Sequence, residues 1–328
     1  MSTVTFFGVR GSCPVSGVEY TRYGGNTSCI LVEVDANTPP IILDLGTGLR
    51  PLGEYLDTYN GNLLKNSNSA APTRSGSNGS GSNSTEPNDI RAVAFVTHLH
   101  WDHIQGLPFF PQANRAKNIL DIYGPAQEER SMLDAYHRFM SPPFFPVGVW
   151  DLESSIRLHG LRPGDKLNVG SATVTAFKVP HTGGLTLGYR IEIGEHSLAF
   201  ISDHQAPLGW EDGALDAEVL SNIRGVDLLI HDAQFTPEEF ELKSDWGHST
   251  VDYAVMVAGQ AGVKHLALYH HDPAHKDSDM DAILQEARSL STIASTYVFA
   301  AQERQVIDLN DLDGSKSDDT KQVGRNFT

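Results

Sequence analysis

The sequence predicts an α/β fold in which two β-sheets lie between layers of helices. Short β-rich runs alternate with helix-patterned segments along the chain. With 328 residues, of which 40% are hydrophobic and 20% charged, the chain is typical of a globular protein with a sizeable core. The sequence contains no internal repeat.

The first part of the chain predicts mainly strands. Three β-rich runs cover residues 4–9, 28–34 and 41–46, a helix covers 49–59, and a buried strand covers 92–98. The elements before residue 60 are too few to form an independent core, so we expect them to pack against the rest of the chain.

The second part adds helices and most of the strands. A helix is predicted over 126–140, where Met132, Tyr136 and Met140 recur at helical spacing. The strands predicted after it cover 155–160, 166–170, 172–180, 187–193, 197–203 and 227–233. The last predicted elements are a helix over 249–262, a strand over 264–271, a helix over 279–290 and a strand over 297–309.

We expect one domain over residues 1–310 with two polar additions. Residues 66–88 are rich in Ser, Asn and Gly and nearly empty of large apolar residues, so they predict a flexible surface insertion. Residues 311–328 form a polar tail that is expected to fray.

Charge and cysteine content restrict the partners. The formal net charge of −17 disfavours broad binding to nucleic acids or anionic membranes, although a local basic patch stays open. Two cysteines, Cys13 and Cys29, are too few for a disulfide scaffold. No run reaches the ~18 apolar residues of a membrane span, and the start lacks the pattern of a secretory signal. The default location is the cytoplasm, and a homodimer is the default assembly.

Four metal-capable side chains follow the predicted strand 92–98. His98, His100, Asp102 and His103 stand within six positions of "THLHWDH". Because side chains alternate along a strand, His98 and His100 can point the same way, while the other two can fold over from the next turn. Imidazole and carboxylate ligands suit Zn²⁺, and also Mn²⁺ or Fe²⁺.

Three later residues stand where other apolar runs end. They are His181 in "KVPHTGG", Asp203 in "FISDHQ" and His270 in "LALYHHD". With the first four residues, this order resembles the signature of the metallo-β-lactamase fold superfamily. That resemblance implies a four-layer αββα sandwich and a hydrolase with one or two metal ions.

The resemblance also implies how seven residues would divide between two divalent metals. One metal would bind His98, His100 and His181, the second would bind Asp102, His103 and His270, and Asp203 would bridge them. A hydroxide held between the two metals would be the nucleophile, which Asp102 helps to place. His271 could replace His270, although the register "LALYH" favours the first histidine.

Further motifs indicate a branch of the superfamily. "DLLIHDAQF" and "WGHST" resemble paired motifs of the tRNA 3′-processing endonucleases and their relatives. By this resemblance His248 would donate a proton to the leaving alkoxide and Asp232 would orient it; a capping contact is the alternative for His248. His231 and Asp232 could instead form only internal hydrogen bonds.

The N-terminal segments "FFGVRGSCPV" and "RYGGNTSCILVE" resemble hydrolases near the cyclic-nucleotide phosphodiesterases and the phosphonate-pathway phosphodiesterase. Arg10 or Asn26 could contact a substrate phosphate, or hold a turn. Asp44 could hydrogen-bond a metal-binding histidine, or cap a turn.

Aromatic residues follow the metal motif and the helix predicted over 126–140. They could stack on a nucleobase or pack within their loops. They are Phe109, Phe110, Phe144, Phe145 and Trp150.

We therefore expect a dinuclear metal-dependent phosphodiesterase acting on a small substrate such as a 3′,5′-cyclic nucleotide. The ligand set has no cysteine, which speaks against antibiotic hydrolysis. The alternatives are tRNA 3′-end endonuclease activity, hydrolysis of a lactone, thioester or lactam, and a non-enzymatic ligand-binding role. The endonuclease would need a basic RNA-holding arm, and residues 61–89 offer only Lys65 and Arg74 against Glu86 and Asp89.

Overall fold

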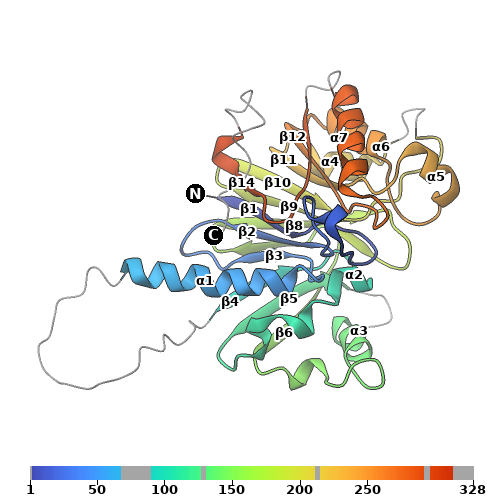
Figure 1. Ribbon diagram of the computed structural model, residues 1–328. Coiled ribbons are helices and arrows are strands. Elements are labelled where there is room, and N and C mark those ends of the chain that lie inside the picture. Colours follow the sequence, from blue (N-terminus) through green and yellow to red (C-terminus); the bar gives the residue numbers. More distant parts are fainter. Residues whose placement is uncertain (1, 68–89, 127–130, 211–214, 292–295, 313–328) are drawn as a thin grey trace, which may run out of the picture.

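The computed structural model describes residues 2–67, 90–126, 131–210, 215–291 and 296–312 (Figure 1). Residues 68–88 of the predicted insertion and 313–328 of the predicted tail therefore lie outside the described residues. Residues 66 and 67 end the first helix, which is longer than the helix predicted over 49–59.

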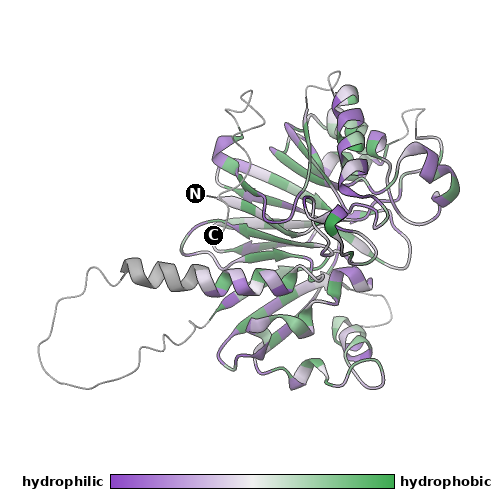
Figure 2. Ribbon diagram, in the orientation of Figure 1, coloured by the Kyte–Doolittle hydropathy of each residue, from purple (hydrophilic) through white to green (hydrophobic). Residues whose placement is uncertain are grey.

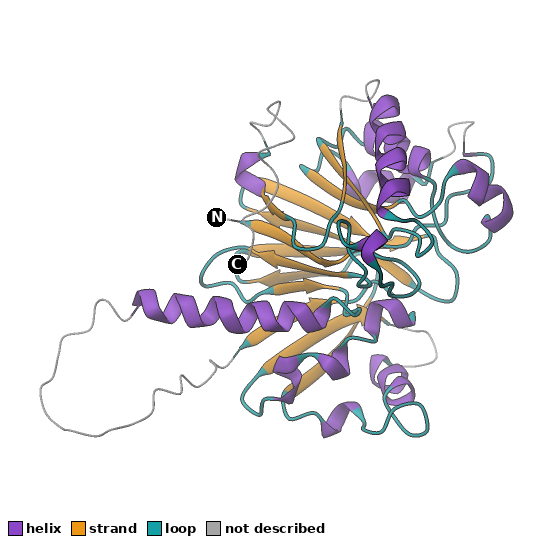
Figure 3. Cartoon of the chain, in the orientation of Figure 1, coloured by secondary structure: helices purple, strands orange, loops and turns teal. Residues whose placement is uncertain are grey.

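Two seven-stranded β-sheets form the centre of the molecule (Figure 3). The first sheet has the order β14-β1-β2-β3-β4-β5-β6. Its strands are β1 Thr3–Gly8, β2 Cys29–Glu33, β3 Ile41–Leu43, β4 Arg91–Phe95, β5 Ile119–Pro125, β6 Ser155–Leu161 and β14 Val306–Asp308. The second sheet has the order β13-β12-β11-β10-β9-β8-β7. Its strands are β7 Lys166–Val169, β8 Ala172–Val179, β9 Thr186–Ile193, β10 His196–Ile201, β11 Leu228–Asp232, β12 His265–Tyr269 and β13 Tyr297–Ala300.

Helices cover the outer faces of both sheets, which confirms the predicted αββα sandwich (Figure 1). On the first sheet lie α1 Leu49–Ser67, α2 Trp101–Ile104 and α3 Met132–Phe139. On the second lie α4 Ala217–Ile223, α5 Pro237–Lys243, α6 Val251–Gln260 and α7 Asp277–Ser291. No helix of the described residues is both long and apolar enough to cross a membrane.

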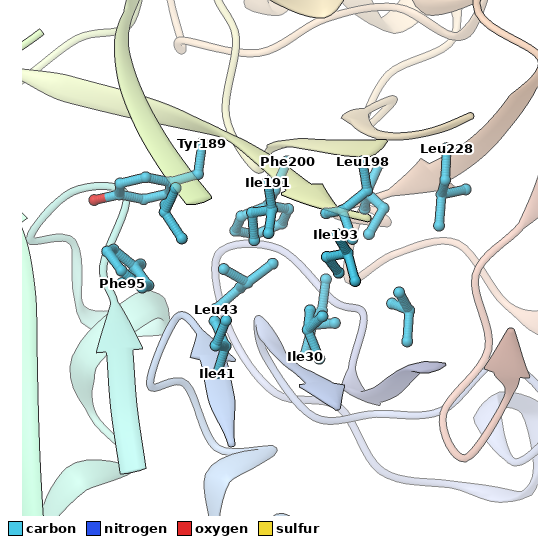
Figure 4. Close-up of a cluster of buried hydrophobic side chains, with 14 of the residues drawn as sticks. Ile30, Ile41, Leu43, Phe95, Tyr189, Ile191, Ile193, Leu198, Phe200 and Leu228 are labelled. Atoms are coloured by element: carbon cyan, nitrogen blue, oxygen red, sulfur yellow. The ribbon is translucent and has the colours of Figure 1, made fainter. Parts of the chain in front are cut away.

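The strands are apolar on both faces because each face is covered. Along β4, Val93 and Phe95 point into the core between the sheets, while Ala94 faces the layer of α1 and α3. Along β11, Ile230 faces the inter-sheet core and Leu229 faces the helices of the second sheet. Figure 4 shows this inter-sheet core, and Figure 2 shows hydrophobic residues along the strands and a mixture of hydrophilic and hydrophobic residues along the helices. Burial of these side chains, ~1.5–3 kcal/mol for each large one, holds the two sheets together.

Parallel strand pairing brings the ends of several strands to one edge of the sandwich. Strands β3 to β6 pair in parallel, as do β10 to β13. Polar residues at or just after strand ends are therefore brought together, as is usual at the carboxyl ends of parallel strands. These residues are Asp44 after β3, His98 after β4, His181 after β8, Asp203 after β10, Asp232 in β11 and His270 after β12.

The prediction of one final strand over 297–309 was wrong. The chain turns at residues 302–305, where Gln305 N donates to Gln302 O and Arg304 has a φ of 66°. As a result β13 pairs with β12 in one sheet and β14 pairs with β1 in the other. The predictions also omitted β5 and the short helices α2, α4 and α5.

Candidate metal centre

Loops and the short helix α2, at the carboxyl ends of the strands, bring the seven predicted ligands together. The first donor group consists of His98, His100, His181 and Asp203, and the second of Asp102, His103 and His270. Within each group, one ligand atom per residue lies within 4.8 Å of the others. A third such group joins Asp203 and His270 with His248.

Asp203 reaches both donor groups with different oxygens. Its Oδ2 lies 3.7 Å from Nε2 of His98 and 3.7 Å from Nε2 of His181 in the first group. Its Oδ1 lies 3.2 Å from Nε2 of His103 and 3.4 Å from Nε2 of His270 in the second group. A carboxylate with one oxygen on each side is placed to bridge two cations.

The spacing in the second donor group fits a tetrahedral metal site. Asp102 Oδ2 lies 3.1 Å from His103 Nε2 and 3.2 Å from His270 Nε2, and the two Nε2 atoms lie 3.3 Å apart. Ligand atoms bound at about 2.0–2.1 Å in a tetrahedron are separated by about 3.4 Å. In the first group, His181 Nε2 lies 3.3 Å from His100 Nδ1.

Buried polar atoms without partners also fit bound cations. His98 Nε2 and Asp203 Oδ1 are both buried, and neither makes a hydrogen bond to a described residue. Such atoms are rare in folded proteins because leaving them unpaired costs about 1–3 kcal/mol each. A cation in each donor group would give His98 Nε2 and Asp203 Oδ1 the partners that they lack. The residues present therefore fit the two divalent ions that the fold implies.

The electrostatics of the cluster keep its carboxylates ionised. Burial alone would raise the pKa of Asp203, but the imidazoles of His270 and His103 outweigh this and hold it well below its usual value. Burial likewise would raise the pKa of Asp102, and His103 again lowers it well below the usual value. Burial lowers the pKa of His98 well below its usual value, so this ring is neutral, as metal binding requires.

Asp44 fixes the orientation of one ligand. Its Oδ2 lies 2.8 Å from His103 Nδ1 and 2.8 Å from the Ser28 hydroxyl, while Oδ1 accepts from Thr97 N at 2.8 Å. With its hydrogen on Nδ1, His103 turns a bare Nε2 toward the cluster. Asp44 has a φ of 58°, a conformation that Asp and Asn tolerate better than most residues.

Two further orienting contacts were not predicted. His270 Nδ1 donates to Gln234 Oε1 at 2.8 Å, and His181 Nδ1 donates to the carbonyl of Gly247 at 2.7 Å. Gln234 follows "LIHDA" directly, so its position beside this motif was the available signal. A carbonyl partner such as Gly247 O leaves no signal in a sequence.

His248 lies beside the cluster and is held by Asp232. Its Nδ1 is 3.1 Å from Asp232 Oδ2 and 3.7 Å from Asp203 Oδ2. Asp232 also accepts from the main-chain amides of His204, Gln234 and Ser249, at 2.9, 3.0 and 3.2 Å. Burial would lower the pKa of His248, but the carboxylate of Asp232 outweighs burial and raises it. The capping role belongs to Thr250, whose side chain accepts from Tyr253 N at the start of α6.

The other histidines near the motifs lie away from the donor atoms. His271 is buried, and its Nε2 donates to the carbonyl of Ala301 at 2.9 Å, so His270 is the residue that joins the cluster. His231 Nε2 lies 3.0 Å from His204 Nδ1 in a hydrogen bond between the two rings. His231 Nδ1 donates to Asp232 O at 2.6 Å. Both rings are fully buried in this internal network.

Arg10 and Asn26 both make hydrogen bonds within the protein. The Arg10 side chain is fully buried and donates to the carbonyls of Gly24, Asp272 and His275 at 2.7–3.1 Å. It holds loops together instead of facing a ligand. The amide of Asn26 donates to Glu303 Oε2 at 3.1 Å, which is the turn-holding alternative.

The aromatic residues of the sequence divide between packing and exposure. Phe110 is buried in the layer between α1 and the first sheet. Phe109, Phe144 and Trp150 are exposed, and Phe109 meets the half-buried Phe145 edge-on at 5.9 Å between ring centroids.

Comparisons with known proteins agree with this architecture. The sequence model of the family described as "Beta-lactamase superfamily domain" matches residues 70–271. Ribonuclease Z of Brevibacillus brevis is 28% identical over 246 residues, which cover 60% of this chain and 74% of that protein.

Solved structures also share the fold, and two of them serve as examples. The metallo-β-lactamase fold protein YhfI of Bacillus subtilis aligns with a TM-score of 0.63 and 17% identity, covering 93% of this chain and 98% of that one. A diphosphatase from the PhnP family aligns with a TM-score of 0.59 and 16% identity, covering 94% and 98%. At such low identity these two likenesses concern the fold alone.

Proposed function

The chain belongs to the β-lactamase superfamily of metal-dependent hydrolases, and from this premise we propose that it is a dinuclear phosphodiesterase. Its proposed substrate is a small phosphodiester such as a 3′,5′-cyclic nucleotide. The observation that carries the proposal is the pair of donor groups that share Asp203, with His248 beside them. The described donor groups contain no cysteine, and His248 lies beside them as a candidate proton donor. Both features favour a phosphodiester substrate over a lactam.

The proposed metal ligands are the seven residues of the two donor groups. Mixed imidazole and carboxylate ligands favour Zn²⁺, with Mn²⁺ or Fe²⁺ as alternatives. When bound, the two cations would supply positive charge and Lewis acidity opposite the phosphoryl group. Asp102, which accepts from Ser12 N at 2.8 Å, is held in place to position the attacking water.

His248 is proposed to protonate the leaving oxygen. Asp232 binds Nδ1 and stabilises the charged ring, so the proton that moves is on the opposite nitrogen, Nε2. As the bond between phosphorus and the leaving oxygen breaks, that oxygen takes this proton. The new bond to phosphorus is formed by a hydroxide, which bound cations would generate by releasing a proton of water to the solvent. Three main-chain amides donate hydrogen bonds to Asp232. They keep its carboxylate in place while His248 loses its proton.

A tRNA 3′-end endonuclease is the second candidate, because the Brevibacillus relative is named Ribonuclease Z. Two features favour the small substrate instead. The net charge of −17 repels a long phosphate backbone, whereas two divalent cations would attract a single phosphate. The sequence also offers only Lys65 and Arg74 as cations in the stretch 61–89 where a basic arm would be expected.

A substrate panel tests the proposal. Purified protein with Zn²⁺ or Mn²⁺ is given cyclic AMP, cyclic GMP, a cyclic dinucleotide, a precursor tRNA and a lactam, and metal content is measured in parallel. We expect turnover of at least one small phosphodiester, and loss of both turnover and metal in Asp203→Ala. The control is His137→Ala, which removes an exposed histidine of α3. Cleavage of the precursor tRNA alone would reverse the ranking, and absence of any hydrolysis would refute the proposal.

A further inference from the structure

Three of the four tryptophans of the chain are exposed. The exposed fractions are 72% for Trp101, 59% for Trp246 and 57% for Trp150, whereas Trp210 is buried. Indole rings are usually largely buried, and an exposed one beside a site offers an amphipathic surface on which a ligand can pack. Trp101 and Trp246 also lie close in sequence to the metal centre: Trp101 begins α2, which carries Asp102 and His103, and Trp246 stands in the loop that leads to His248.

Each of these two tryptophans is fixed by its neighbours in the sequence. Trp101 lies between His100 of the first donor group and Asp102 of the second. Trp246 precedes Gly247, whose carbonyl accepts from His181, and His248, whose Nδ1 lies 3.7 Å from Asp203 Oδ2.

One imidazole connects the two loops. His181 approaches His100 Nδ1 with its Nε2 at 3.3 Å and donates from Nδ1 to the carbonyl of Gly247 at 2.7 Å. Gly247 has a φ of 97°, and a Cβ there would lie 2.5 Å from His181 Cε1, so the loop is pressed against the ring. The two ring nitrogens of His181 therefore contact the residue before Trp101, through the His100 side chain, and the residue after Trp246, through the Gly247 carbonyl.

A cation accompanies Trp246. The ammonium of Lys243 lies 5.6 Å from the centroid of this indole and 4.7 Å from that of Phe235, and 3.2 Å from Asp272 Oδ2. A cation over the face of an aromatic ring stabilises the ring's position. Trp246 is thus exposed and also held in place.

We propose that Trp101 and Trp246 form the binding site for the nucleobase of a nucleotide substrate. This inference rests on the proposed phosphodiesterase function. With the phosphodiester at the donor groups, the attached base extends outward past the two loops, where an indole face offers a stacking surface. Stacking tolerates every base because each has an aromatic face, so we expect little discrimination between adenine and guanine.

Paired substrates test the proposal. The full chain, loaded with Zn²⁺, is given adenosine 3′,5′-cyclic monophosphate or the abasic ribose 3′,5′-cyclic phosphate, which has the same phosphodiester without a base. Losing one stacking partner should raise KM for the adenosine substrate about tenfold or more in Trp101→Ala and Trp246→Ala, with kcat little changed. The abasic substrate should be unaffected by either change. Trp150→Ala is the matched control, since Trp150 is similarly exposed but lies in the turn 149–151, outside the donor loops.

Tryptophan fluorescence provides a readout that needs no turnover. Adenosine monophosphate should quench the emission of the wild-type protein, and Trp101→Phe and Trp246→Phe should each remove part of the quenching that Trp150→Phe retains. Equal KM changes for both substrates, or unchanged quenching in both donor-loop variants, would overturn the nucleobase site. If the wild type hydrolyses neither substrate, the substrate panel decides the proposed function, and the fluorescence measurement still decides whether the indoles bind a base.

Discussion

Asp44→Asn should weaken metal binding at the second donor group while leaving the fold intact. Asparagine keeps the shape of the side chain and tolerates the φ of 58° at this position, whereas alanine would add backbone strain of ~1–2 kcal/mol. The change therefore isolates the loss of one carboxylate oxygen. Two fixed donors depend on that pair of oxygens: Thr97 N on Oδ1 and His103 Nδ1 on Oδ2.

An asparagine has one oxygen for these two donors, so one of them must face an amide NH₂. If the asparagine oxygen turns toward Thr97 N, the asparagine NH₂ group faces His103 Nδ1. His103 then favours the tautomer that carries its hydrogen on Nε2. That tautomer cannot bind a metal through Nε2. A hydrogen bond to a charged group contributes about 1.5–3 kcal/mol, which corresponds to ~10–100-fold in metal affinity.

The assay is competition with a chelating dye, together with the number of metals per chain from native mass spectrometry. We expect one tightly bound metal to remain, because Asp44 contacts none of His98, His100 and His181 among the described hydrogen bonds. Two metals bound with wild-type affinity in Asp44→Asn would refute the reasoning. Loss of both metals would show that the two donor groups do not fill independently.

Three further predictions follow from the same geometry. His248→Ala should lower kcat by ~100-fold or more, the usual contribution of a general acid, while both metals stay bound; loss of metal, measured by mass spectrometry, would contradict the acid role. Gly247→Ala should lower the metal content, because the added Cβ would lie 2.5 Å from His181 Cε1. Gly194→Ala controls for backbone strain, since Gly194 has a φ of 60° and open space around it. Equal metal content in the two variants would contradict a role for the His181 contact. Removing metal with a chelator should lower the melting temperature in calorimetry, because buried atoms such as Asp203 Oδ1 lose their partner; an unchanged melting temperature would show that the donors relax without cost.

The order of the elements and most of the donor residues could be predicted because their signals are local. A buried strand is apolar over its whole length, and a polar residue directly after it, such as His181 or Asp203, stands out in the sequence. The predicted final strand failed for the same reason. Residues 297–309 have a continuous strand pattern, but which sheet each half joins depends on β12 and β1, far away in the chain.

By itself, the sequence predicted the fold class from its strand and helix patterns, and the resemblance of its motifs to a known superfamily implied which seven residues are candidate metal ligands. Only the tertiary structure decided how these residues are used. It placed the two oxygens of Asp203 on different donor groups and chose His270 over His271. It also placed Arg10 among main-chain carbonyls. The physical reason is that the direction of a side chain and its hydrogen-bond partners are set by neighbours that are distant in the sequence.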